Sequence, residues 1–353
     1  MNKMVAVLLG VTLGLLSGCI PVTELDQRGI VTAMGIDREE GGQFTVTAAL
    51  YAGEDAPATF CTGRGRTVSE AVREAGSRAG RALFYAQNRL LFVGEEVVAE
   101  GLEPLIGFFT SAYQCRPNVY VFLCEDGAER AVACQGKHQP LNADFLDEGR
   151  PVALGQNIAP VLLYRLAVLY DNDGGCGYLP VLSCPDGESF QFGKTAVFRA
   201  GRPAGMLEGD AHRGLLWVTD SATGGLMTDR ASGLGQFSAE ISQVRTAWSL
   251  SEGGITLRVE VELGIAEGEV PYSEAFAAET ERVLGRRIER ELATLWRETV
   301  GAGIDLFDLS ARMRRDLPAL WEAEKDRIEE YLAECKSEIS VECRITHSGL
   351  RIE

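Results

Sequence analysis

The chain has 353 residues, a formal net charge of -17 at pH 7 and nine cysteines. Its length corresponds to about two domains, or to three small ones. The acidic balance argues against a nucleic-acid-binding protein, because phosphate neutralisation requires clustered lysine and arginine. It also argues against electrostatic adhesion of the whole body to anionic lipid headgroups.

The first predicted element is an export signal over residues 1–18. Lys3 precedes an apolar run from Met4 to Leu16, and small residues then lead to Cys19. As a helix this run reaches only about 20 Å, against roughly 30 Å for the hydrocarbon core of a bilayer, so it spans a membrane poorly. A basic start, a short apolar segment and small residues at the cleavage point are typical of a secretory signal. No later run of apolar residues is long enough to predict a membrane span.

The order Leu16-Ser17-Gly18-Cys19 resembles a bacterial lipobox. In such a box the cysteine thiol receives a diacylglyceryl group, with palmitate as the expected acyl chain, and becomes the first residue of the mature protein. Acyl chains give stable attachment, because each buried methylene contributes about 0.8 kcal/mol. We therefore predict lipidation of Cys19 and a folded body held at the outer face of a membrane. The alternative interpretation is an ordinary signal peptide, or a poor transmembrane anchor, that happens to meet a cysteine.

The other eight cysteines allow disulfides, because their number is even and the chain is exported. The connectivity cannot be read from the sequence. Two local pairs are a hypothesis, Cys124 with Cys134 and Cys335 with Cys343, because each would close a short loop. Buried free thiols are the alternative. The sequence contains no C-x-x-C pair, the motif that would predict a zinc site.

The first half of the mature chain predicts strands alternating with helices. Two strands, 30–37 and 44–50, flank a polar, glycine-rich turn and form a hairpin. Thr67 and Glu70 fit a capping box that opens a helix over 68–83. Because many of its apolar residues are alanine, we expect this helix to lie close against a sheet.

Buried strands are predicted over 89–94 and 119–123, with a helical stretch over 95–109 between them. The density of glycine and proline over 135–160 predicts a loop-rich junction. A helix over 158–170 follows it.

The main domain boundary is predicted near residue 190, after two clusters of turn-forming residues. The chain is thus divided into the signal peptide, 1–18, an N-terminal region, 19–190, of one or two subdomains, and a C-terminal domain, 191–353.

The C-terminal part contains the two clearest patterns. Residues 255–265 alternate apolar and polar side chains, as a half-buried strand does. An apolar stripe at helical spacing predicts a long helix over 276–296. Two shorter helices, 305–315 and 318–335, and a last strand, 339–345, complete the order. A sheet with one solvent-exposed face is usually antiparallel. The predicted fold class is therefore α+β, with mixed or antiparallel sheets and packed helices in two to three domains.

No enzyme signature is found. The sequence has three histidines, His138, His212 and His347, and no G-x-S-x-G elbow. The segment from Gly187 to Thr195 resembles a phosphate loop, but five residues separate Gly187 from Gly193 where the Walker pattern has four. It also leads into a predicted strand rather than a helix N-terminus. The four tryptophans are expected to pack in the core. We therefore expect a non-enzymatic protein without a cofactor or a metal.

Several motifs, taken in order, resemble one known family. In the first half they are the lipobox, Glu24-Leu25, residues 30–37, residues 65–71, residues 93–96 and Gly101-Leu102. The second half adds residues 193–198, the long helix, Asp305, Trp321 and the terminal strand. From Cys19 to Gly349 the chain is similar to the C-subunit lipoproteins of nutrient germinant receptors in spore-forming bacteria, the Ger(x)C family. It departs from them at Ile20-Pro21, where the family usually has Trp-Asp, and at Gln87, where many members have histidine.

The resemblance implies a non-enzymatic subunit, lipid-anchored at the outer surface of the spore inner membrane. There it would work with an A subunit and a membrane-embedded B subunit, and the nutrient is not expected to bind this subunit directly. The alternative is a substrate-binding lipoprotein of a membrane transporter, which shares the anchor and the acidity. Such proteins normally have two α/β lobes around a cleft, and the late amphipathic strand 255–265 disfavours that architecture. A cell-envelope enzyme is a third and weaker alternative.

Overall fold

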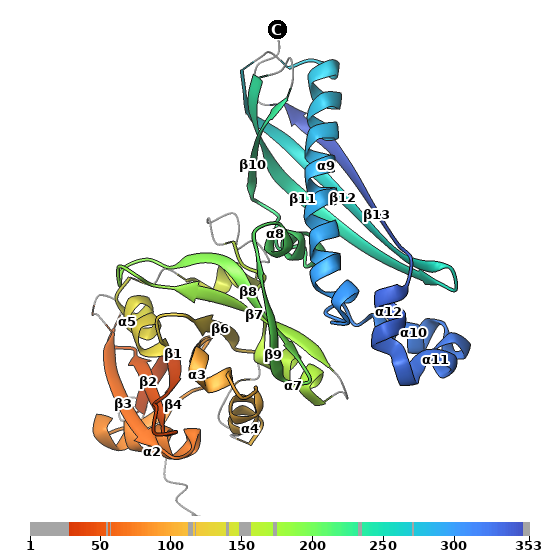
Figure 1. Cartoon of the computed structure of the whole chain (residues 1–353). Coiled ribbons are helices and arrows are strands. Elements are labelled where there is room, and N and C mark those ends of the chain that lie inside the picture. The colour runs from red at the N-terminus through yellow and green to blue at the C-terminus, as the bar shows by residue number, and fades with distance from the viewer. Residues whose placement is uncertain are drawn as a thin grey trace, which may run out of the picture.

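The computed structural model describes residues 28–348, except 54–55, 57, 112–115, 117, 139–140, 148–156, 172–174, 232–234 and 270–271. The described residues form two sheets with helices packed on them (Figure 1), which confirms the predicted α+β class. The predicted signal and Cys19 lie outside the described residues.

The first sheet has nine strands within the described part of the chain, in the order β3-β2-β1-β5-β6-β7-β8-β9, with β4 paired to β1. Its strands are β1 (Arg28–Arg38), β2 (Phe44–Leu50), β3 (Thr59–Gly65), β4 (Ala82–Phe84), β5 (Leu90–Gly94), β6 (Tyr120–Cys124), β7 (Cys176–Ser183), β8 (Gln191–Arg199) and β9 (Arg202–Glu208). The central strands β1, β5, β6 and β7 are parallel. The pairs β1–β2, β2–β3, β7–β8 and β8–β9 are antiparallel, so the sheet is mixed. The predicted hairpin is the β1–β2 pair.

Helices cover both faces of the first sheet. One face carries α2 (Val68–Ala79), α3 (Glu95–Val98), α4 (Glu103–Ser111) and α7 (Leu163–Asp171), and the other carries α5 (Ala128–His138) and α6 (Ala143–Asp147). This double cover explains why every residue of β2, β5 and β6 is buried. Strands buried on both faces appear in a sequence as continuous apolar runs rather than alternating ones.

Helix α2 lies directly on β3, as its alanine-rich face predicts. The Thr67 hydroxyl caps the helix by accepting a hydrogen bond from the backbone N–H of Glu70. A Cβ atom on Gly63 of β3 would lie 2.2 Å from the backbone nitrogen of Ala75, so only glycine permits this approach. The helix ends at Gly80, which adopts a left-handed conformation with φ 63. It is therefore shorter than the predicted helix over 68–83.

The prediction of a loop-rich junction over 135–160 is wrong at its start. Helix α5 continues to His138 and includes Gly136. A Cβ atom on Gly136 would lie 2.7 Å from the ring of Phe60, so this glycine makes room for a helix–strand contact instead of ending the helix. The helical stretch predicted over 95–109 is divided into α3 and α4 next to Gly101, whose φ is +140.

The second sheet has the order β10-β11-β12-β13 among the described residues. Its strands are β10 (Leu226–Ala231), β11 (Gly235–Ser251), β12 (Gly254–Gly268) and β13 (Ser337–Ser348). The predicted alternation over 255–265 is confirmed in β12, where every second residue is buried from Ile255 to Leu263. β11 pairs antiparallel with β12, whereas β13 pairs parallel with it. The chain reaches β13 through a helical crossover.

The long predicted helix is confirmed as α9 (Glu274–Glu298), which is capped by Ser273 and packs its apolar stripe on the second sheet. The remaining helices are α8 (Gly209–Val218), α10 (Leu309–Asp316), α11 (Pro318–Glu324) and α12 (Ile328–Glu334), with 3-10 turns over Val300–Ala302 and Lys325–Arg327. The helix predicted over 318–335 is thus divided in two by a 3-10 turn.

Helix α8 connects the two sheets (Figure 1). It follows β9 at the edge of the first sheet and packs on α9, which covers the second sheet. Both β8 and β9 come after residue 190 and belong to the first sheet. The division of the chain between 190 and 191 stays a prediction.

Candidate functional site

The predicted lipidation residue, Cys19, precedes the described residues. Eight residues, 20–27, separate it from Arg28, the first residue of β1. Lipidation of Cys19 therefore stays a prediction. Within the part of the chain that the structure describes, no helix combines the length and the apolarity that crossing a bilayer requires.

A buried ionic cluster joins α8 to α9. The side chain of Glu291 on α9 is 0% exposed. Its carboxylate accepts hydrogen bonds from Arg213 Nε at 2.8 Å and from Arg287 Nε at 3.1 Å. The indole Nε1–H of Trp217 donates a third, at 2.8 Å. An isolated buried carboxylate would be strongly destabilising, and these three donors compensate its lost hydration.

An outer ring of charges surrounds this cluster. Asp210 accepts hydrogen bonds from Arg213 and from Arg290, and Arg287 lies 3.5 Å from the carboxylate of Asp229. Partial burial acts to raise the pKa of Asp210, but the hydrogen bond from Arg290 and the charge of Arg213 hold it below its usual value. Three guanidinium groups thus face three carboxylates, counting Glu291. The cluster has no excess charge with which to attract an ion.

A cavity of about 180 Å³ adjoins the cluster, between α8, α9 and the strands β10 and β11. Ligand pockets for drug-sized molecules usually measure about 300–1,000 Å³. The small volume and the balanced charges favour a structural joint between α8 and α9 over a ligand site.

His212 ties α8 to the first sheet. Its Nε2–H donates to the backbone carbonyl of Asn157 at 3.0 Å, so Nδ1 accepts from the hydroxyl of Thr195, also at 3.0 Å. Burial lowers the pKa of His212 below its usual value, and the ring is neutral at neutral pH. With both nitrogens engaged and 2% of the residue exposed, His212 is not placed to act as a catalytic base.

The Gly193-Lys194-Thr195 segment lies in β8. It is therefore part of a strand, as the sequence predicted, and does not lie at the N-terminus of a helix, where a phosphate loop would place it.

Both predicted disulfides are wrong. The four cysteines concerned, Cys124, Cys134, Cys335 and Cys343, are free thiols. Cys134 on α5 instead lies near the thiol of Cys184, which follows β7. Burial, with a smaller contribution from the neighbouring Cys184 thiol, raises the pKa of Cys134 to about 12. The packing of α5 beside the end of β7 therefore gives Cys134 its neighbour, and closeness to Cys124 in the sequence does not.

The tryptophans pack mainly as expected. Trp217 is 3% exposed within the core of the second sheet. The ring of Trp248 stacks on Phe307 with centroids 5.0 Å apart and lies 6.3 Å from the ring of Trp296. Trp321 is half-buried. Over the described ranges, no three histidine, cysteine, aspartate or glutamate side chains gather as a metal site requires.

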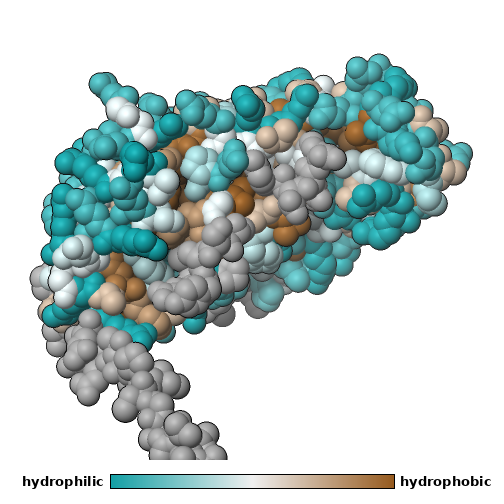
Figure 2. Space-filling view, turned by 90° about the horizontal axis from the view of Figure 1, so that it is seen from below, coloured by the Kyte–Doolittle hydropathy of each residue, from teal (hydrophilic) through white to brown (hydrophobic). Residues whose placement is uncertain are grey.

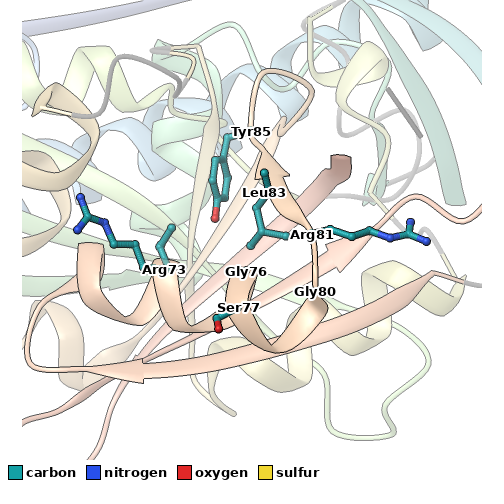
Figure 3. Close-up of a pocket in the computed structure, with 9 residues that line it drawn as sticks. Arg73, Gly76, Ser77, Gly80, Arg81, Leu83 and Tyr85 are labelled. Atoms are coloured by element: carbon teal, nitrogen blue, oxygen red, sulfur yellow. The ribbon is translucent and has the colours of Figure 1, made fainter. Parts of the chain in front are cut away.

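A surface pocket lies beside α2 and β4, at the end of the first sheet where β1 begins (Figure 3). Its volume is about 540 Å³. Leu83 and Tyr85 lie between Arg73 and Arg81, whose side chains extend in opposite directions (Figure 3). The pocket thus has an apolar floor flanked by two guanidinium groups.

Sequence reasoning missed both the ionic cluster and this group of arginines. A usable signal for the cluster was Glu291 itself, a carboxylate within the apolar stripe that Ile288 and Leu295 define. The arginines were missed because the net charge of the whole chain conceals where the positive residues gather.

Comparisons with known proteins cover both halves of the chain. Residues 21–184 match the family described as spore germination protein N-terminal domain. Residues 193–349 match the family described as spore germination B3/GerAC like, C-terminal. These two matched segments contain nearly all of the described residues.

A curated relative and a solved structure agree with this assignment. Spore germination protein KC of Bacillus subtilis (strain 168) is 23% identical over 394 residues, which covers 99% of this chain and 96% of the relative. The crystal structure of the GerBC protein is similar with a TM-score of 0.58 and 16% identity, over 89% of this chain and 96% of that one. The second likeness is one of fold. The chain belongs to the Ger(x)C family of spore germination proteins.

Proposed function

We propose that this protein is the lipid-anchored C subunit of a nutrient germinant receptor. It is held at the outer face of the spore inner membrane and acts together with an A subunit and a membrane-embedded B subunit, which are separate chains. The observation that carries the proposal is the match of both halves, 21–184 and 193–349, to spore germination domains. A substrate-binding lipoprotein of a transporter is not favoured, because these matches leave no half of the chain for a different class of protein.

The role is non-enzymatic and rests on contact with the other subunits. The buried titratable groups described above support this view, because their partners belong to the fold itself. Glu291 is satisfied by three donors, and both nitrogens of His212 are engaged. The nutrient is expected to bind another subunit.

Attachment is proposed to depend on Cys19 alone. The lipobox residues 16–19 support it, since acyl chains on one cysteine supply stable membrane binding. Cys19→Ala should leave an unprocessed precursor or release the protein to the soluble fraction of spores or sporulating cells. The matched control is Cys335→Ala, which removes a half-buried thiol far along the chain and should leave the protein in the membrane fraction. Mass spectrometry of the mature N-terminal peptide checks the modification directly, and an unmodified Cys19 would contradict the anchor.

The N-terminal region is proposed to select the receptor partners, because it follows the anchor in the chain and so lies closest to the membrane subunits. A chimera tests this. In a strain that lacks the gene, residues 19–190 are replaced by the corresponding region of another receptor's C subunit, with the anchor kept intact. Failure to restore germination, in spores that contain the chimera at normal abundance, is the expected result. Full rescue would show that partner choice does not reside in residues 19–190.

A further inference from the structure

Two cysteines from distant segments lie close together beside α5. Cys134 is in the second half of that helix, and Cys184 directly follows β7. Burial raises the pKa of Cys134, and the thiol of Cys184 lies near enough to add to that rise. The face of the molecule in Figure 2 is mainly hydrophilic with apolar areas between, whereas the two cysteines are each only 1% exposed. The pair is therefore enclosed by the fold.

Two further contacts hold α5 against the segment that follows β7. The backbone N–H of Cys184 donates to the carboxylate of Asp126, just before α5, at 2.8 Å. On α5 itself, the guanidinium group of Arg130 donates to the backbone carbonyl of Pro185. Side chains four residues apart share one face of a helix, so Cys134 lies on the face that carries Arg130. That face is directed toward the segment in which Cys184 lies.

The position of α5 on the sheet is itself fixed. The carboxylate of Asp37, at the end of β1, accepts hydrogen bonds from the first two backbone N–H groups of α5 at 2.7 and 2.8 Å. A Cβ atom on Gly35 of β1 would lie 2.8 Å from the side chain of Val132, so the helix rests directly on the strand. The closeness of Cys134 to Cys184 therefore follows from the packing of the backbone and not from one side-chain rotamer.

A third thiol lies nearby but is directed elsewhere. Cys124 is the last residue of β6 and is also 1% exposed. Its thiol donates to the backbone carbonyl of Phe122 on the same strand, at 3.8 Å. Cys61 on β3 belongs to the core on the opposite face of the sheet, under α2. Cys134 and Cys184 are thus the two cysteines of this region that the fold brings together.

We propose that Cys134 and Cys184 form a disulfide in the exported protein, which ties α5 to the end of β7. The inference goes beyond the proposed function and uses only the predicted export, because disulfides persist in oxidising compartments. The two thiols pass two protons and two electrons to an oxidant that is itself a disulfide, and a bond forms between their Sγ atoms. The disulfide of the oxidant is broken and becomes two thiols. Oxidised glutathione serves as this oxidant in the test below.

Burial determines when the bond can form. The thiolate is the form that attacks a disulfide, and burial raises the pKa of Cys134 to about 12, so the folded protein reacts slowly. The bond therefore forms while α5 docks on the sheet, before the thiols are enclosed. It closes a loop over residues 135–183, which contains α6, α7 and nearly all of β7. A closed loop stabilises the fold because it restricts the unfolded chain.

The test maps the bond directly. The mature chain is unfolded in urea with dithiothreitol and refolded in a mixture of reduced and oxidised glutathione. Remaining thiols are alkylated, and the protein is digested without reduction by trypsin and chymotrypsin, which separate Cys184 from Cys176 at Tyr178. We expect the peptide over residues 131–137 to be linked to the peptide of Cys184, with two hydrogens fewer than the two reduced peptides together. The same link is expected in protein from spores that are lysed in the alkylating reagent.

Thermal unfolding supplies a second measurement with a matched control. The chain refolded with glutathione should melt about 5 °C higher than the same chain refolded in dithiothreitol alone. Cys134→Ser should show no difference between the two conditions. Cys61→Ser removes a buried thiol from the other face of the same sheet, and it should keep both the link and the difference.

The outcomes separate the disulfide from the predicted export. Alkylation of both Cys134 and Cys184, in the refolded chain or in processed spore protein, would overturn the proposal. A difference in melting temperature that Cys134→Ser retains would overturn it as well. Spore protein that still carries residues 1–18 would contradict the export instead, and the refolding experiment then decides the disulfide by itself.

Discussion

The carboxylate of Glu291 depends entirely on protein donors, because none of its side chain reaches solvent. Replacing it with glutamine removes the charge and leaves Arg213 and Arg287 without their shared partner. We expect Glu291→Gln to lower the free energy of unfolding by about 3 kcal/mol. Glu289→Gln, two residues away on the exposed side of α9, should change it by less than about 0.5 kcal/mol. Urea unfolding of the two variants makes the comparison, and equal stabilities would contradict the assigned role.

His212 predicts a dependence of stability on pH. Burial lowers the pKa of His212 in the folded protein from 6.5. Between the two pKa values the unfolded chain therefore binds a proton that the folded chain does not bind. The free energy of unfolding should therefore be constant above about pH 7 and fall as the pH decreases below 6.5, until the lower folded pKa is reached. Urea titrations at a series of pH values measure the slope. His212→Gln should flatten it in this range, whereas His138→Gln at an exposed position should leave it unchanged. A wild-type protein without this slope would show that His212 titrates normally.

At the scale of elements, the contact of α2 with β3 relies on glycine. A Cβ atom on Gly63 would meet the backbone of Ala75, which cannot rotate away as a side chain can. Gly63→Ala should therefore lower the free energy of unfolding by about 2–3 kcal/mol through overpacking. Gly41→Ala is the matched control, because a Cβ atom there has no heavy atom within 4 Å. Thermal or urea unfolding that ranks the two variants equally would contradict the close packing.

The sequence predicted best the elements in which the same face is buried along the whole length. β12 alternates because one of its faces is covered, and α9 has an unbroken stripe because one side packs on the sheet. β11 was not predicted, since a register shift between Ile241 and Gln243 moves the buried residues to the other parity before Val244.

The candidate sites were harder to predict, because they depend on contacts between distant segments. Cys134 meets Cys184 across two elements, which no spacing rule reveals. Likewise, Arg28 and Arg81 are brought together only by the β1–β4 register. The signal for lipidation of Cys19 lies instead in the linear order of residues 16–19, and this lipidation stays a prediction.

For the whole molecule, the first sheet, α8 and the second sheet follow one another away from the end where β1 begins (Figure 1). The proposed anchor precedes β1 in the chain, so the first sheet is the part proposed to lie nearest the membrane subunits. Under the proposed function the fold supplies contact with the other subunits, and the response to nutrient depends on the assembled receptor.

The most direct test of the receptor-subunit role is the germination of spores that lack this gene. The proposed function predicts that these spores lose the response to the nutrients of one receptor and still germinate with triggers that bypass receptors. Restoring the intact gene should recover the response, and restoring it with Cys19→Ala should not. Mutant spores that germinate with every nutrient as fast as the parent strain would contradict the assignment as a required receptor subunit.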